Sequence, residues 1–318
     1  MSNRNNAEFL TSIDSFDLSC VEKEKKTDNV LKKKHKGIDL TRLIVILLCL
    51  SVFAYSIYSL YEIYASNLES DTLYGDIYSD FADVLNNGIS LKKDTVPGQS
   101  SLLSSSPYSP SKGGSFNTIE QGSTSLKFQQ ALSKLESLRS QNQDIVGYIS
   151  ISGTGINYPL LQCGDNDFYL KHGFDKTYMK SGSIFYDFRS DATPDRNKNL
   201  IIYGHNMSNG SMFQQLENYT EKEDIFQNGT ITIYSFNGIY TYEIFSVYFT
   251  SAYSNYLDIA FRSDADFVKW CEDRAMLSLY KKEVTLNKDS HIVSLSTCVN
   301  ATSDGRIAVH GVLTNVER

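Results

Sequence analysis

The sequence predicts a mainly β domain, folded as a closed or nearly closed barrel with helices on its outside, behind an N-terminal transmembrane helix and a flexible linker. Three observations lead to this prediction: an uncharged apolar run, a segment rich in Ser, Gly and Pro, and many short strand-like runs with few helices after it. The chain has 318 residues, 41% of them hydrophobic, which suffices for a substantial core. Its net charge of -7 argues against a nucleic-acid partner, because phosphate binding needs a basic face.

The apolar run covers residues 43–61 and contains no charged side chain, which is about the length of a membrane-spanning helix. Five basic residues precede it closely, against the single acidic Asp39, whereas acidic residues alone follow it until Lys92. The basic flank is expected to stay in the cytoplasm, so residues 1–42 are predicted to be a polar cytoplasmic tail. A cleaved signal peptide is the main alternative, but its charged leader would be much shorter, so a retained anchor is favoured.

Residues 62–125 are predicted to be an extracellular stalk and linker. Within them, residues 67–86 have apolar side chains near helical spacing and could form an amphipathic helix. Residues 97–125 contain ten Ser, four Gly and three of the five Pro of the chain. Such a composition cannot bury enough apolar surface to fold, so this segment is interpreted as a tether.

Residues 126–318 have the pattern of a globular domain. Its first residues fit one face of a helix, and two further helices are expected near residues 212–219 and 264–280. The strand-like runs are rich in Val, Ile, Tyr, Phe and Thr and are bounded by Gly, Asn, Asp or Ser. They cover residues 145–151, 183–186, 199–203, 230–236, 239–250, 291–297 and 306–313.

The local setting of Cys298 makes it the candidate nucleophile among five cysteines that are odd in number and form no CxxC pair. It ends a predicted strand, and a loop follows it, so a rigid element would carry the thiol while the loop admits substrate. Arg306 opens the next strand. Its permanently charged guanidinium could lower the pKa of the thiol, hold a substrate carbonyl or stabilise an oxyanion.

A thiol nucleophile also needs a base or a cationic partner, and five histidines are available. His35 is excluded by the predicted topology, His291 begins the nucleophile's strand and is too far away, and His310 lies deeper in its own strand. His205 follows a predicted strand, as the nucleophile does, and is the best placed. His172, in a polar loop, remains open, and a strand-end histidine is as often structural as catalytic.

Several motifs within residues 126–318 resemble those of one known family. The run Leu-Ser-Thr-Cys298 followed by Gly-Arg306-Ile resembles the TLxTC…R signature of sortases, and Asn-Leu-Ile-Ile-Tyr-Gly-His205-Asn-Met is similar to their histidine motif. A further stretch resembles the class B branch, through Asp144-Ile-Val-Gly-Tyr-Ile, Ile156-Asn-Tyr-Pro-Leu-Leu-Gln162, Asp165-Asn-Asp-Phe-Tyr-Leu170 and Gly182-Ser-Ile-Phe185.

The resemblance implies an eight-stranded closed β-barrel and a cysteine transpeptidase. Cys298 would attack the carbonyl of a threonine in a C-terminal sorting motif and form a thioacyl enzyme. His205 would protonate the departing amine and later deprotonate the incoming one, while Arg306 would orient the substrate and stabilise the oxyanion. The positions that match the class B peptide groove are Asn166, Leu170 and Ser296. Class A sortases bind calcium through acidic residues, but no compelling cluster is seen here, so neither a metal nor another cofactor is expected.

The implied partners are secreted proteins with a sorting motif, the membrane through residues 43–61, and an amine of a cell-wall precursor or a pilin. The expected location is the cell membrane of a mostly Gram-positive group, with a single pass and the catalytic domain outside. A pilin-polymerising sortase, a cysteine peptidase without transfer and a non-catalytic module that binds a sorting peptide remain alternatives. The short loop between Cys298 and Arg306 departs from many class B members, as do Val299 and Asn300 in place of an acidic residue.

Overall fold

The computed structural model describes residues 39–86, 125–298 and 304–318. It forms two compact units, one up to Tyr61 and one from Glu62 to Arg318, and each is described by itself. The predicted cytoplasmic tail before residue 39, the Ser-rich linker within residues 87–124 and the departures at Val299 and Asn300 lie outside the described residues.

The first unit contains the beginning of α2 (Leu40–Asn86), a helix of 47 residues. The apolar side chains between residues 43 and 61 are exposed within the chain. By length and composition the helix is able to cross a membrane, as predicted for residues 43–61. Its direction across a membrane stays a prediction.

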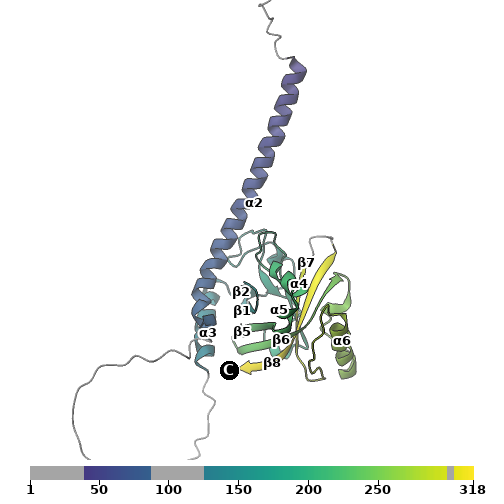
Figure 1. Cartoon of the computed structure of the whole chain (residues 1–318). Helices are drawn as coiled ribbons and strands as arrows, with labels where there is room; N and C mark the ends of the chain where they lie inside the picture. Colours follow the sequence, from purple (N-terminus) through teal and green to yellow (C-terminus); the bar gives the residue numbers. More distant parts are fainter. Residues whose placement is uncertain (1–38, 87–124, 299–303) are drawn as a thin grey trace, which may run out of the picture. The chain divides into compact units, whose positions relative to one another are not determined.

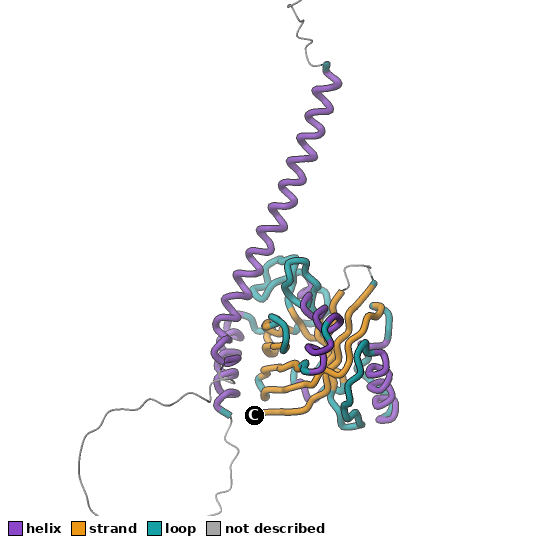
Figure 2. Tube along the Cα trace, in the orientation of Figure 1, coloured by secondary structure: helices purple, strands orange, loops and turns teal. Residues whose placement is uncertain are grey.

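The second unit is built on a closed barrel of eight strands, which confirms the predicted fold class (Figures 1 and 2). Around the barrel the strands follow the order β1-β2-β3-β4-β7-β8-β6-β5. Their bounds are β1 (Ile145–Ile151), β2 (Asn157–Leu161), β3 (Ile184–Tyr186), β4 (Asn199–Tyr203), β5 (Thr230–Ser235), β6 (Gly238–Ser251), β7 (Ile292–Cys298) and β8 (Gly305–Glu317).

Two of the eight pairings in this barrel are parallel, β2 with β3 and β4 with β7, and the others are antiparallel. The longest ladder joins β6 and β8, from Ile239 opposite Glu317 to Ser251 opposite Gly305. The strands enclose one large apolar core of Ile, Leu, Val, Tyr and Phe side chains. The β-rich composition that predicted a barrel is therefore the composition of its interior.

One strand, β2, was not predicted as a strand. It contains Pro159, and a proline within a short run argues against a central strand because it has no N–H to donate. In the structure Pro159 pairs with Tyr148 of β1, whereas β3 pairs with Leu160 and Leu161. The N–H of Gln162 donates to the carbonyl of Asp144 on the β1 side, so by the two-residue alternation along the strand the nitrogen of Pro159 points away from β1. The β1–β2 ladder therefore needs no N–H at this position.

The C-terminal part of α2 packs on this barrel. Phe81 is 1% exposed and stacks on Tyr148, with ring centroids 4.1 Å apart and an interplanar angle of 6°. The ring of Tyr234 meets Phe81 edge-on at 5.3 Å. The amphipathic helix expected over residues 67–86 is present, and its apolar face joins the barrel core through Tyr74, Ile77, Phe81 and Val84.

Two longer helices flank the barrel, α3 (Leu126–Gln141) and α6 (Asp264–Leu277), and each begins at a serine whose hydroxyl accepts a backbone N–H of the first turn. In Figure 1, α6 lies outside β6 and β8, where it covers a small apolar cluster around Trp270. The remaining helical segments are short: η1 (Phe168–Leu170), η2 (Pro194–Arg196), η3 (Gln214–Glu217), α4 (Asn218–Glu221), α5 (Glu223–Gln227) and η4 (Asn255–Leu257).

The helix expected over residues 212–219 is divided between η3 and α4. Met212 has a positive φ of 56°, which a helix does not allow. The N–H of Phe213 donates to the carbonyl of His205 at 2.8 Å instead of to a helical partner. A contact within the loop after β4 therefore replaces the first turn of the expected helix.

Candidate active site

The ends of three neighbouring strands gather the predicted catalytic residues. β4 and β7 run parallel, with Tyr203 opposite Ser296, so both strands end at the same edge of the barrel. His205 follows β4 by two residues, and Cys298 is the last residue of β7. β8 begins at this edge, and its Arg306 is the register partner of Cys298. Backbone pairing thus brings together residues that are far apart in the sequence.

A cavity of about 280 Å³ opens at this edge. Its lining includes all five predicted site residues whose side chains the structure describes, and the side chain of Cys298 lies outside the described part. The cavity is lined by Asn166, Asp167, Leu170, Tyr203, Gly204, His205, Ala252, Tyr256, Leu257, Ser296, Thr297 and Arg306.

The imidazole of His205 is half-buried and held at a fixed angle. Its Nε2 lies 2.7 Å from the backbone carbonyl oxygen of Leu170. A carbonyl oxygen can only accept, so Nε2 carries a hydrogen in this arrangement and Nδ1 is left for other partners. Leu170, predicted from sequence as part of a peptide groove, therefore also orients the predicted acid–base residue.

Gly204 lets the chain pass closely behind His205. A Cβ at this position would lie 2.4 Å from Cδ1 of Ile184 and 2.7 Å from Cδ2 of Phe213. Its N–H donates to the carbonyl of Ser296 at 3.3 Å, which continues the β4–β7 ladder by one residue. The glycine thus keeps His205 beside the end of β7.

Arg306 is half-buried at the start of β8, between the strand that ends in Cys298 and Thr250 of β6. Its Nη1 donates to the carbonyl of Gly305 at 2.8 Å. A guanidinium offers five N–H donors and stays charged at every physiological pH. The cavity therefore carries a fixed positive charge beside the backbone of Cys298.

The predicted substrate residues form two walls of the cavity. Asn166 and Leu170 come from the loop that joins β2 to β3, around η1. Ser296 belongs to β7 and is buried, with its hydroxyl 2.8 Å from the hydroxyl of Tyr256 on η4. The two walls therefore come from segments that are distant in the chain.

The other described histidines lie elsewhere. His172, which the sequence left open, stacks on Phe168 at 4.1 Å and does not line the cavity. His291 contacts the carbonyl of Asn197 through Nδ1 at 2.8 Å, at the opposite end of β7. His310 is fully buried, and this burial, with the nearby charge of Arg274, lowers its pKa to about 3.

Several lining residues were not predicted from the sequence. Tyr203 stands two positions before His205 in the motif that was singled out, so its place was within reach of the argument. Ala252, Tyr256 and Leu257 lie in an irregular stretch after β6 that carries no motif. Among the described residues, no group of three or more His, Cys, Asp or Glu side chains is placed to hold a metal ion.

Comparison with known proteins matches residues 149–314 to the model of the Sortase domain family. Sortase B of Listeria monocytogenes is 36% identical over 182 residues, which is 57% of this chain and 74% of that protein. Sortase B of Staphylococcus aureus is 35% identical over 186 residues, 56% of this chain and 76% of that protein.

Solved structures with similar folds are also those of sortase B proteins. A mutant form of Clostridium perfringens sortase B is 32% identical and superposes with a TM-score of 0.56, covering 59% of this chain and 90% of its own. A Staphylococcus aureus sortase B–substrate complex is 33% identical with a TM-score of 0.54, covering 59% of this chain and 91% of its own.

Proposed function

Because the chain belongs to the sortase family of cysteine transpeptidases, in its class B-like branch, we propose that it attaches secreted proteins to the cell wall. It would cleave a C-terminal sorting motif after threonine and transfer the threonyl carbonyl to an amine of a cell-wall precursor. The observation that carries the proposal is the register of β7 and β8, in which Cys298 pairs with Arg306 beside the end of β4.

In the proposed first half-reaction, the thiolate of Cys298 attacks the threonyl carbonyl carbon and forms a tetrahedral oxyanion. The guanidinium of Arg306 stabilises this negative charge, which develops in the transition state and is absent from the bound peptide. As the intermediate collapses, the C–N bond breaks and the departing amine takes a proton from His205. A thioester on Cys298 and a free C-terminal peptide result.

In the second half-reaction an amine attacks the thioester carbonyl, and His205 removes its proton. The C–S bond breaks, a new amide forms, and the thiolate is restored. The hydrogen bond from Nε2 to Leu170 supports this role, because it holds the imidazole in one orientation through both proton transfers. Transfer instead of hydrolysis requires that the amine reach the thioester before a well-placed water does.

The proposed location is the cell membrane, with residues 43–61 spanning it once, residues 1–42 in the cytoplasm and the catalytic domain outside. The proposal is supported by the apolar helix α2 and by the basic residues before it. Residues 62–125 would act as stalk and linker, and residues 126–318 would carry the chemistry. Tethering raises the effective concentration of enzyme near membrane-held substrates and lipid-linked precursors.

The substrates would be secreted proteins with a C-terminal sorting motif, in a Gram-positive cell wall, and the proposed reaction requires no cofactor. The Staphylococcus aureus relative has been solved as a substrate complex, which supports substrate binding by this fold. The cavity beside His205 and Arg306 is the proposed place for a peptide substrate here. Asn166, Leu170 and Ser296 are proposed to contact that peptide.

The test uses the full chain in detergent with a library of synthetic peptides in which a threonine is flanked by varied residues. Oligoglycine and a diamino acid peptide serve as amine acceptors. We expect mass spectrometry to detect an acyl adduct on Cys298 and an amine-dependent product, both absent in Cys298→Ala. Cys163→Ala is the matched control, since Cys163 is half-exposed outside the cavity lining.

The same experiment separates the alternatives. Turnover that is equally fast without amine would replace transfer by peptidase activity. With a lysine-containing pilin peptide added as a third acceptor, exclusive use of that lysine would replace wall anchoring by pilin polymerisation. Peptide binding without any adduct on Cys298 would make the domain a non-catalytic module.

A further inference from the structure

A buried carboxylate lies directly behind one wall of the cavity. Asp187 is the first residue after β3, and its side chain is 0% exposed. Two side-chain nitrogens of Arg189 donate to this carboxylate, Nε to Oδ1 and Nη2 to Oδ2, both at 2.8 Å. The backbone N–H of Arg189 also donates to Oδ1, at 2.9 Å. A carboxylate this deep is stable only with such a set of donors.

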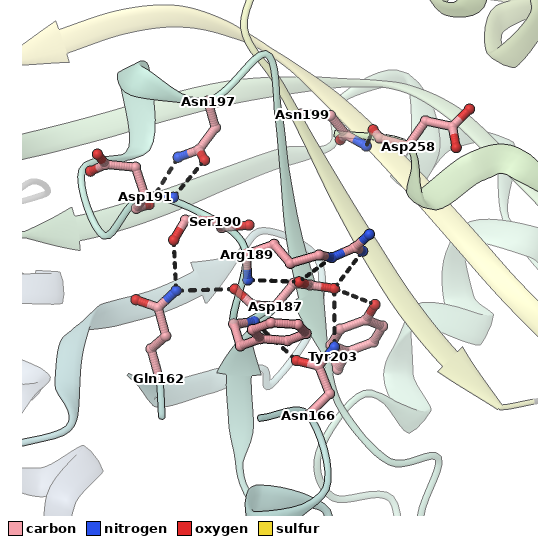
Figure 3. Close-up of polar contacts among 11 residues, drawn as sticks. Gln162, Asn166, Asp187, Arg189, Ser190, Asp191, Asn197, Asn199, Tyr203 and Asp258 are labelled. Carbon is pink, nitrogen blue, oxygen red and sulfur yellow. Dashed lines mark hydrogen bonds and ion pairs between the residues drawn. The ribbon is translucent and has the colours of Figure 1, made fainter. Parts of the chain in front are cut away.

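Two further donors to the same carboxylate are cavity residues. The hydroxyl of Tyr203 donates to Oδ2 at 2.9 Å, and Nδ2 of Asn166 donates to Oδ2 at 3.1 Å. Figure 3 shows the carboxylate of Asp187 with Tyr203 and Asn166 on one side and Arg189 on the other. Both side chains line the cavity that His205 and Arg306 also line.

The carboxylate is charged. Burial acts to raise the pKa of Asp187, but the hydrogen bonds from Arg189 and Tyr203 outweigh it and hold the pKa below its usual value. The pKa of Tyr203 is raised, first by burial and then by the negative charge of Asp187, so its phenol stays protonated. The donor and acceptor roles in the pair are therefore fixed.

The charge dictates what each side chain offers to the cavity. Tyr203 donates its only hydroxyl hydrogen to Asp187, so toward any other partner its hydroxyl oxygen can act only as an acceptor. Asn166 gives one N–H to Asp187 and accepts the N–H of Phe188 on Oδ1 at 3.0 Å. An amide flip would place Oδ1 against the carboxylate and Nδ2 against an N–H, so one orientation is selected and one N–H is left over.

The main chain that carries this carboxylate is held by contacts to both flanking strands. The N–H of Asp187 donates to the carbonyl of Ile201 on β4 at 3.0 Å. Nε2 of Gln162, just after β2, donates to the carbonyls of Asp187 at 3.0 Å and Ser190 at 2.8 Å. The turn that carries Asp187 and Arg189 is therefore tied to β4 through Ile201 and to the end of β2 through Gln162, whose two bonds are drawn in Figure 3.

We propose that Asp187, held by Arg189, is a positioning residue of the active site. It orients the Asn166 amide so that one N–H is presented to a substrate backbone carbonyl, and it holds the Tyr203 ring against the groove beside His205. This inference rests on the proposed function for its consequence in catalysis, while the orientation of Asn166 does not depend on it. Asp187 touches neither substrate nor reacting atoms in this role.

The first test is a cycle of variants of the full chain in detergent, assayed with the library peptide that gives the most adduct on Cys298. Asp187→Asn should lower kcat/KM about tenfold or more, mostly through KM. In a chain that already carries Asn166→Ala and Tyr203→Phe, the same change should cost less than about threefold. A purely structural carboxylate would cost the same in both backgrounds, and that outcome would overturn the proposal.

Asp191→Asn is the matched control. It is the same substitution on a carboxylate four residues away that also accepts a backbone N–H, from Thr193 at 2.8 Å, but whose partners Thr193 and Arg196 do not line the cavity. We expect its kcat/KM to be unchanged. Should Asp187→Asn not fold, Arg189→Gln takes its place, because Arg189 is 41% exposed in its side chain and its loss removes the two bonds that fix the carboxylate toward Asn166 and Tyr203. Its kcat/KM should also fall, and the fall should again be smaller in the chain that carries Asn166→Ala and Tyr203→Phe; equal losses in both backgrounds would overturn the proposal.

The second test needs no activity. In wild-type protein labelled with ¹⁵N, the side-chain amide of Asn166 should give two well-separated proton signals, assigned by their loss in Asn166→Ala. In Asp187→Asn they should move toward the values of a freely rotating amide, and in Asp191→Asn they should stay. Unmoved signals would overturn the inference. Moved signals in a chain that forms no adduct would uphold it and count against the proposed function instead.

Discussion

Phe81 is predicted to be one of the side chains that hold α2 on the barrel, so Phe81→Ala should destabilise the catalytic domain. The ring is 1% exposed, stacks on Tyr148 at 4.1 Å and meets Tyr234 edge-on at 5.3 Å. Removing a buried phenylalanine costs about 3–5 kcal/mol, and the loss of two aromatic contacts places this site in the upper part of that range. For a domain of this size, a loss of that order lowers the melting temperature by about 10 °C.

The assay is urea unfolding of the full chain in nonionic detergent, followed by the fluorescence of Trp270. This is the one tryptophan of the chain, and it belongs to α6, where it packs against β6, β7 and β8 and not against α2, so it reports unfolding of the domain as a whole. Phe249→Ala, at a phenylalanine 56% exposed on β6, is the matched control, with an expected change below about 1 kcal/mol. If Phe81→Ala unfolds at the same urea concentration as the control, α2 is not part of the cooperative domain and the packing argument is refuted.

Three further predictions follow from the site and its surroundings. Gly204→Ala should cost about 1–3 kcal/mol in urea unfolding and reduce kcat, because its Cβ would lie 2.7 Å from the ring of Phe213, whereas Gly164→Ala, with nothing within 4 Å, should change neither. The pKa of His310 is about 3 in the folded chain and about 6.5 in the unfolded chain, so between these pH values only the unfolded chain is protonated at this residue. The free energy of unfolding should therefore fall by about 2 kcal/mol from pH 7 to pH 5 through His310 alone. In His310→Gln, the free energy of unfolding measured in urea should decrease by about 2 kcal/mol less over the same pH range. If the guanidinium stabilises an oxyanion, Arg306→Ala should lower kcat about 100- to 1,000-fold with little change in KM, and Arg306→Lys should lower kcat less. A rise in KM of that size with kcat unchanged would instead assign Arg306 to ground-state binding.

Much of the barrel could be predicted because its strands are short, rich in β-branched and aromatic residues, and bounded by turn residues. Seven of the eight strands correspond to runs recognised in the sequence. The missed strand, β2, contains Pro159. The cost of a proline in a strand depends on whether a neighbouring strand needs an N–H at that position, which is a property of the pairing and not of the sequence run. The packing of α2 on the barrel could not be predicted either, because an amphipathic pattern shows that one face of a helix is apolar but does not show which element that face contacts.

The catalytic candidates followed from strand ends, because a residue there is both rigidly held and accessible. The supporting residues did not. Asp187 is an ordinary acidic residue after a three-residue strand, and its burial under Arg189, Tyr203 and Asn166 comes from contacts between loops that no sequence spacing encodes. Tyr256 reaches Ser296 from an irregular stretch after β6 for the same reason.

The parallel pairing of β4 and β7 is the step in the fold on which the site depends. Antiparallel neighbours end at opposite edges of a barrel, whereas this parallel pair ends at one edge and delivers His205 and Cys298 together. β8 then returns antiparallel from that edge, so its second residue, Arg306, falls opposite Cys298. A slip of one residue between β7 and β8 would exchange the two faces of β7 and put Ser296 on the wrong side of the barrel wall. The buried contact between Ser296 and Tyr256 opposes such a slip, so the register that seals the core is also the register that assembles the site.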